Sequence, residues 1–95
     1  MIERLNLLNV NKKDEIIIET MNNTYKFNKL EENKFIVTGG VFGNKGTSIK
    51  LLGIGTDIES NRKFMELGKS LFFKHKEEIG CTSKIKKITI NRKEE

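Results

Sequence analysis

The chain has 95 residues, of which 36% are apolar and 33% charged, and its formal net charge at pH 7 is +5. This length suits one domain with one core and excludes the deep two-domain cleft that many enzymes use. No apolar run approaches the roughly 20 residues that cross a bilayer, and the first residues lack the layout of a secretion signal. A single cysteine, Cys81, cannot form an internal disulfide. We therefore expect one domain over residues 1–95, in the cytoplasm and with no membrane partner.

Positive charge is distributed unevenly along the chain. Residues 1–60 carry eight Lys or Arg and eight Asp or Glu, whereas residues 61–95 carry ten against five. Phosphates attract cations over long distances and independently of sequence, so a basic end on a neutral body is typical of a polyanion binder. The charge pattern therefore predicts nucleic acid as a partner.

The first half of the chain predicts antiparallel strands. The runs 14–20 and 24–29 are rich in β-branched and aromatic residues and flank Asn22-Asn23, a pair that suits a two-residue hairpin turn. With that turn, Glu19 would lie opposite Lys26, and the two charges would attract each other across the strands. Residues 2–10 fit either a bulged strand or a short helix, and the strand is the favoured interpretation.

A glycine-rich stretch predicts a second hairpin. Six of the eight glycines lie between residues 39 and 55, and two apolar runs in this stretch flank residues 43–46, which read Gly-Asn-Lys-Gly. Because Gly and Asn accept positive φ, this segment is predicted to be a turn with Lys45 at its tip. Glycines at 39, 40 and 53 indicate bulges, strong coiling or the close approach of another backbone.

One long helix is predicted between about residue 56 and Gly80. Residues 56–59, Thr-Asp-Ile-Glu, have the form of a capping box, and a glycine suits the C-terminal stop. Apolar side chains then recur at steps of three and four residues, which would form a stripe facing the sheet. The stripe consists of Phe64, Leu67, Gly68, Leu71, Phe72, His75 and Ile79.

These elements together predict an α+β fold. A curved antiparallel meander of five to six strands would pack against the one long helix in the C-terminal half, followed by a final strand over residues 86–92. In that strand Ile88 and Ile90 share one face. If residues 2–10 were helical, a winged-helix-like arrangement with the glycine hairpin as the wing would be the alternative.

Cations of the predicted helix, the final strand and the hairpin tip could lie on one side of such a fold. We therefore predict a non-enzymatic accessory protein that binds nucleic acid, with DNA as the first expectation, and that acts as a homodimer. The predicted phosphate contacts are Lys45, Arg62, Lys63, Lys69, Lys74, Lys76, Lys84, Lys86 and Lys87.

Phe73 suggests an alternative function. The helical periodicity that buries Phe72 turns Phe73 toward solvent, beside Lys69 and Lys76. An exposed aromatic ring suits a protein contact, so the alternative is an interaction or inhibitor module that docks an acidic partner through Phe73 and the glycine-rich hairpin. A third interpretation, a small-ligand binder in the concave face of the sheet, has no polar anchor in the sequence.

Nothing in the sequence predicts catalysis. His75 is the only histidine, and together with Cys81 it cannot complete a structural zinc site. The carboxylates are scattered, without a general acid and base pair at a recognisable spacing. We therefore expect no enzyme, no cofactor and no metal.

Overall fold

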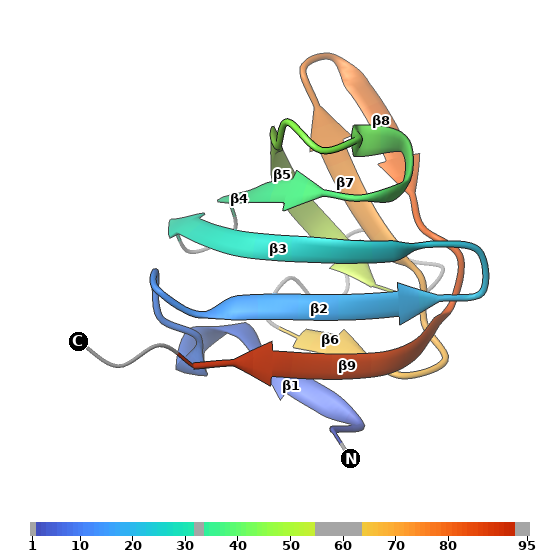
Figure 1. Ribbon diagram of the computed structural model, residues 1–95. Coiled ribbons are helices and arrows are strands. Elements are labelled where there is room, and N and C mark those ends of the chain that lie inside the picture. Colours follow the sequence, from blue (N-terminus) through green and yellow to red (C-terminus); the bar gives the residue numbers. More distant parts are fainter. Residues whose placement is uncertain (1, 32–33, 55–63, 93–95) are drawn as a thin grey trace.

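The computed structural model describes residues 2–31, 34–54 and 64–92 (Figure 1). In these residues the chain forms antiparallel strands and two short 3₁₀ turns. The elements are β1 (Arg4–Asn6), η1 (Leu7–Asn9), β2 (Glu15–Thr20), β3 (Thr24–Glu31), β4 (Lys34–Thr38), η2 (Gly40–Phe42), β5 (Thr47–Ile54), β6 (Phe64–Glu66), β7 (Leu71–His75), β8 (Glu78–Cys81) and β9 (Ile85–Asn91).

The predicted α+β fold is wrong, because the described part of the predicted helix consists of strands β6, β7 and β8. Gly68 has a φ of +81° and Lys76 a φ of +55°, and both values interrupt a right-handed helix. Between them, residues 71–75 alternate between the two faces of a sheet. The capping box at residues 56–59 lies outside the described residues.

Among the described residues, seven strands form one antiparallel sheet in the order β8-β7-β5-β4-β3-β2-β9, and β1 pairs with β6 in a second, two-stranded sheet. The large sheet is strongly curled (Figure 1). Its two edge strands, β8 and β9, follow each other in the chain. At their junction Ile85 donates its N–H to the carbonyl of Lys69 at 2.9 Å, and its carbonyl accepts the N–H of Gly68 at 2.8 Å. The segment from β8 to β9 thus draws the two edges of the sheet together.

The core fills the concave side of this curl. Inward side chains alternate with outward ones along β2 and β4, as a half-buried strand requires. The short β1–β6 pair and η1 contribute Leu5, Leu7 and Met65 to the same cluster. The remaining core side chains are Val10, Ile16, Ile18, Tyr25, Phe27, Phe35, Val37, Ile49, Leu51, Leu71, Ile85 and Ile88.

The first predicted hairpin is confirmed, but its register differs. Glu19 lies opposite Thr24 instead of Lys26. The turn residues are therefore Met21 and Asn22, and Thr20 donates its N–H to the carbonyl of Asn23 at 2.8 Å. A shift of two residues keeps every side chain on its predicted face, because side chains alternate with a period of two.

The second hairpin is also present, with η2 and residues 43–46 between β4 and β5. Gly39 has a φ of +99°, and a Cβ there would overlap the backbone carbonyl of Thr24. The pairing of β5 with β7 shifts between Leu51 and Gly53. Of the alternatives that the sequence left open for glycines 39, 40 and 53, the structure thus has a close approach of another backbone at residue 39 and a register shift next to residue 53.

Residues 2–10 contain the short strand β1 followed by the 3₁₀ turn η1. Lys29 fixes this turn from the neighbouring sheet. Its ammonium donates hydrogen bonds to the carbonyls of Leu7 and Val10, at 2.9 and 3.0 Å. Within the turn the Leu7 carbonyl also accepts the N–H of Val10 at 3.2 Å, so Lys29 adds a second hydrogen bond to that carbonyl and one to the carbonyl of Val10, which follows the turn.

Asp14 connects the loop before β2 to the C-terminal end of β9. Its side chain is buried, and one carboxylate oxygen accepts hydrogen bonds from the guanidinium of Arg92 and from the N–H of Asn11, both at 3.0 Å. Arg92 also donates to the carbonyl of Asn9 at 3.2 Å. This cluster holds the segment that contains Asn9, Asn11 and Asp14 against Arg92, which follows Asp14 by 78 residues in the sequence.

We predict that Asp14→Ala lowers the free energy of unfolding by about 2–3 kcal/mol, because the Asn11 N–H loses its acceptor and Arg92 its partner. Urea denaturation monitored by circular dichroism measures the change. Glu31→Ala is the control, because its ion pair with Lys34 is exposed and contributes at most about 1 kcal/mol. Equal losses in the two variants would show that Asp14 is not a structural connection.

Candidate functional site

Three of the predicted phosphate contacts lie at one end of the sheet. Lys74 is on the outer face of β7, Lys76 is in the turn between β7 and β8, and Lys45 is in the turn before β5. All three side chains are exposed. Because β7 pairs with β5, the ends of both strands bring these turns to the same side of the molecule.

A second group gathers at the opposite end of β7. Lys69 precedes β7, and its carbonyl bonds to the N–H of Ile85. Lys84 and Lys86 flank Ile85 in the chain, so backbone pairing places all three lysines around the junction of β8 and β9. The single cationic surface that the sequence predicts is therefore divided into two groups.

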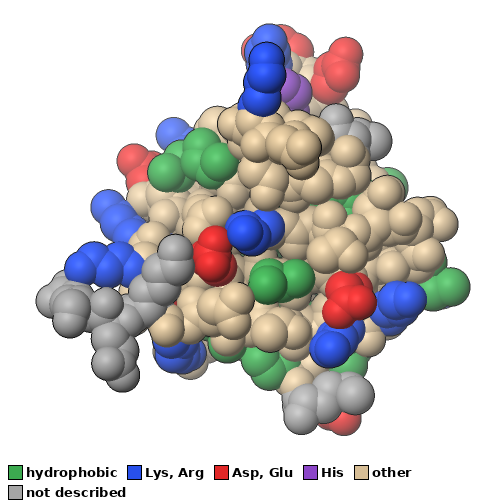
Figure 2. All heavy atoms as spheres, in the orientation of Figure 1, with side chains coloured by type: hydrophobic (Ala, Val, Ile, Leu, Met, Phe, Trp, Pro, Cys, Tyr) green, Lys and Arg blue, Asp and Glu red, His purple; other side chains and the backbone are tan. Residues whose placement is uncertain are grey.

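Lys87 belongs to neither group. It lies on the outer face of β9, 3.8 Å from the carboxylate of Glu19, and on the neighbouring strands Lys26 lies 3.5 Å from Glu15. Figure 2 shows acidic and basic side chains next to each other over β2, β3 and β9. This face has no continuous positive charge. Arg62 and Lys63 lie outside the described residues.

A row of three lysines crosses the outer face of β4, β5 and β7. Lys34 is the register partner of Lys50, and Lys50 is in turn the partner of Lys74. All three side chains are exposed. Sequence analysis identified only Lys74 of this lysine row, because Lys34 and Lys50 belong to the electrically balanced first part of the chain.

The lysine row places like charges directly opposite one another, which destabilises a sheet. Lys34 has a partial counter-charge, since Glu31 lies 3.8 Å away and both side chains are exposed. Within the described part of the chain, no carboxylate lies within ion-pair distance of Lys50 or Lys74. The row therefore presents a net positive charge to solvent.

Phe72 and Phe73 occupy the opposite faces to those that sequence analysis predicts. Phe73 is half-buried against the core, and its ring lies edge-on to Phe42 with centroids 5.2 Å apart. A Cβ at Gly80 would meet this ring at 2.8 Å, so the glycine makes room for it. Phe72 lies on the outer face, two residues before Lys74. The predicted helical periodicity would expose Phe73 to an acidic partner. The alternation of side chains along strand β7 turns it toward the core instead.

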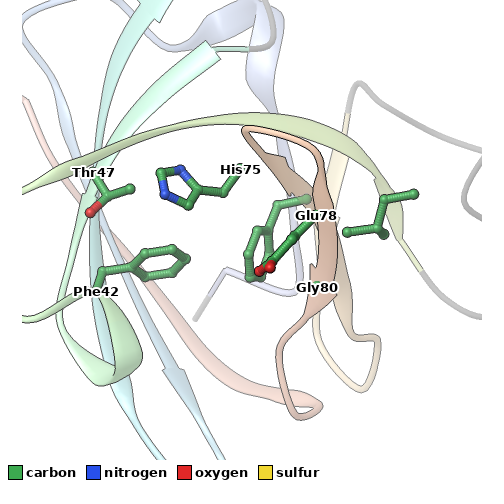
Figure 3. A pocket seen from close by; sticks show the side chains of 7 residues that line it. Phe42, Thr47, His75, Glu78 and Gly80 are labelled. Carbon is green, nitrogen blue, oxygen red and sulfur yellow. The ribbon is translucent and has the colours of Figure 1, made fainter.

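A pocket of about 300 Å³ opens at the end of the curl near the β7–β8 turn. Phe42 and Phe73 supply aromatic walls. Figure 3 shows the side chains of Phe42, Thr47, His75 and Glu78 around the same hollow. His75 and Glu78 are register partners on β7 and β8, so the hairpin holds them side by side.

The polar side chains of the pocket have defined hydrogen-bonding roles. Nδ1 of His75 lies 3.2 Å from the carbonyl of Ser48, and since a carbonyl only accepts, Nδ1 carries the proton. In the neutral ring, Nε2 is then an acceptor. Glu78 adds two carboxylate oxygens and Thr47 a hydroxyl. These are the polar anchors that the sequence did not reveal; the alternation of Phe73 and His75 along one strand face was the signal that could have found them.

Neither a metal centre nor a membrane-spanning helix is found in the described ranges 2–31, 34–54 and 64–92. No three His, Cys, Asp or Glu side chains gather there in a way that could hold a metal ion. No helix within them has the length and the apolar character needed to span a bilayer.

We predict that Phe73→Ala lowers the free energy of unfolding by about 2 kcal/mol, because a half-buried ring leaves the core. Phe72→Ala should cost less than about 1 kcal/mol, since its ring is outside the core cluster. Denaturant titration of both variants measures the difference. A larger loss of unfolding free energy for Phe72→Ala than for Phe73→Ala would indicate the predicted helix, in which Phe72 is buried.

Comparisons with protein families, with curated proteins and with solved structures find no match to this chain. The arrangement of side chains on the outer face and around the pocket is therefore the basis for assigning a function.

Proposed function

We propose that this protein binds single-stranded nucleic acid on the outer face of β4, β5 and β7. Lys34, Lys50 and Lys74 contact consecutive phosphates, and Phe72 stacks on a base. The observation that carries the proposal is the cross-strand lysine row, in which two members have no carboxylate partner within the described part of the chain.

The spacing of the lysine row suits a phosphate backbone. Neighbouring strands are about 4.8 Å apart, so three successive lysines span about 10 Å at their Cα atoms. Their long side chains can adjust to the separation of adjacent phosphates. Bound phosphates also remove the repulsion within the row, so the charges that destabilise the free sheet favour the complex.

Phe72 supports a single-stranded ligand. Unpaired bases expose their faces, and proteins that bind single strands combine a basic track with aromatic side chains on which bases stack. Duplex readers instead insert a helix or a β-ribbon into the major groove, and the outer face of β4, β5 and β7 is a broad surface. Single-stranded DNA is the first ligand to test. The cytoplasm as compartment and the homodimer remain part of the proposal.

We predict that a Lys50→Gln, Lys74→Gln double variant binds a 12-nucleotide single-stranded DNA more weakly at every sequence. Two lost phosphate contacts should reduce the slope of log affinity against log salt by about 1.4. Fluorescence anisotropy in rising salt measures both quantities. Thermal unfolding of the variant should be unchanged or improved, because like charges have been removed.

The matched control is Lys26→Gln with Lys87→Gln, which removes two lysines that carboxylates already neutralise. This control should retain nearly all of the affinity. Equal losses in both double variants would indicate nonspecific attraction by net charge. No binding by the wild-type protein at the lowest salt, with binding to an acidic polypeptide in its place, would favour a protein partner and remove the proposal.

A further inference from the structure

We infer that the pocket beside the β7–β8 turn receives one unpaired base of the bound strand, and that Glu78 accepts a hydrogen bond from the amino group of that base. This inference rests on the proposed function, because it needs a strand that lies along the lysine row. It adds a base preference that the phosphate contacts alone do not supply.

The pocket and the lysine row lie on opposite faces of β7, and both lie near the end of that strand. Lys74 is directly followed by the pocket residue His75, and then by Lys76, which turns the chain into β8. On β5, the pocket residue Thr47 lies three residues before Lys50. A nucleic-acid strand held on the lysine row therefore reaches the rim of the pocket within one or two nucleotides. The exposed Lys76 lies beside that rim.

The shape of the pocket suits a flat ring. Phe42 and Phe73 form two aromatic walls at an angle of 61°. A side chain at Gly80 would meet the Phe73 ring, so glycine keeps that ring in place at the wall. The volume of about 300 Å³ is at the lower end of small-molecule sites, which run from roughly 300 to 1,000 Å³.

The polar groups of the pocket favour a ligand that donates hydrogen bonds. When the imidazole of His75 carries one proton, Nδ1 donates it to the Ser48 carbonyl and Nε2 is an acceptor. The Glu78 carboxylate only accepts, and no cation within the described residues lies within ion-pair distance of it. Adenine, cytosine and guanine carry an exocyclic amino group with two N–H donors for such acceptors, whereas thymine has no amino group and offers only its ring N3–H.

Because Glu78 is negatively charged, the direction in which its removal changes the affinity tests the inference. A carboxylate beside a polyanion repels it, so removing a carboxylate that plays no further role should tighten binding. If Glu78 holds an amino group, removing its charge should instead weaken binding of the matching base. Glu77, the preceding residue, is an exposed carboxylate in the turn and is outside the pocket lining.

The experiment measures the affinity of wild type, Glu78→Gln and Glu77→Gln for four 12-nucleotide oligothymidines. Their central position holds guanine, cytosine, thymine or an abasic sugar, and anisotropy is read at one low salt concentration. Wild type should bind the guanine and cytosine strands roughly tenfold more tightly than the thymine and abasic strands. Glu78→Gln should lose most of this preference, and Glu77→Gln should keep it with equal or tighter affinity for all four.

The outcomes separate this inference from the proposed function. Equal binding of all four strands by wild type would overturn the base pocket and leave the lysine row standing. Tighter binding by Glu78→Gln to every strand, as for Glu77→Gln, would show that Glu78 acts only as a repelling charge and would also overturn the pocket. No binding of any strand would overturn both proposals. Unfolding curves of the two variants should match wild type, because both side chains are exposed.

Discussion

The arrangement of this molecule depends on one continuous segment that belongs to both edges of the sheet. Residues 78–81 pair with β7 and residues 85–91 pair with β2, so the same stretch of chain forms both edge strands, which are six positions apart in the sheet order. The backbone bonds of Ile85 fix the crossing point. A flat sheet could not satisfy both pairings, and the curl that results creates one concave side large enough to hold the core.

The same curl separates the two parts of the candidate site. Strand alternation sends Phe73 and His75 inward, toward the open end of the concave side, and sends Phe72 and Lys74 outward on the same strand. A single five-residue strand thus supplies a wall and a polar group to the pocket and an aromatic ring and a cation to the outer face. The pocket and the lysine row are adjacent because both depend on β7.

How much of the fold the sequence predicts depends on the kind of signal. The two hairpins and the final strand have strict alternation or turn residues, and these elements are present. The helix is wrong because apolar residues in Phe64–Ile79 satisfy a period of three to four about as well as a period of two, and the capping box and Gly80 favoured the helix. Gly68 was the residue that argued against the helix. A glycine inside a helix only lowers its stability, whereas Gly68 has a positive φ and lies in a turn between two strands. As a result, Phe72 and Phe73 lie on the opposite faces to those that the helix predicted.

The candidate site was harder to predict than the strands. A count of charges along the sequence does not show which residues lie opposite each other once the strands pair. Lys34 and Lys50 belong to a part of the chain whose charges sum to zero. Register sorts those charges: Glu15 and Glu19 lie against Lys26 and Lys87 on one side of the curl, while Lys34, Lys50 and Lys74 align on another. A cationic surface can therefore come from an electrically neutral sequence when strand pairing segregates the acids. The repulsion that this segregation creates within the free sheet is the physical reason to look for an anion that relieves it.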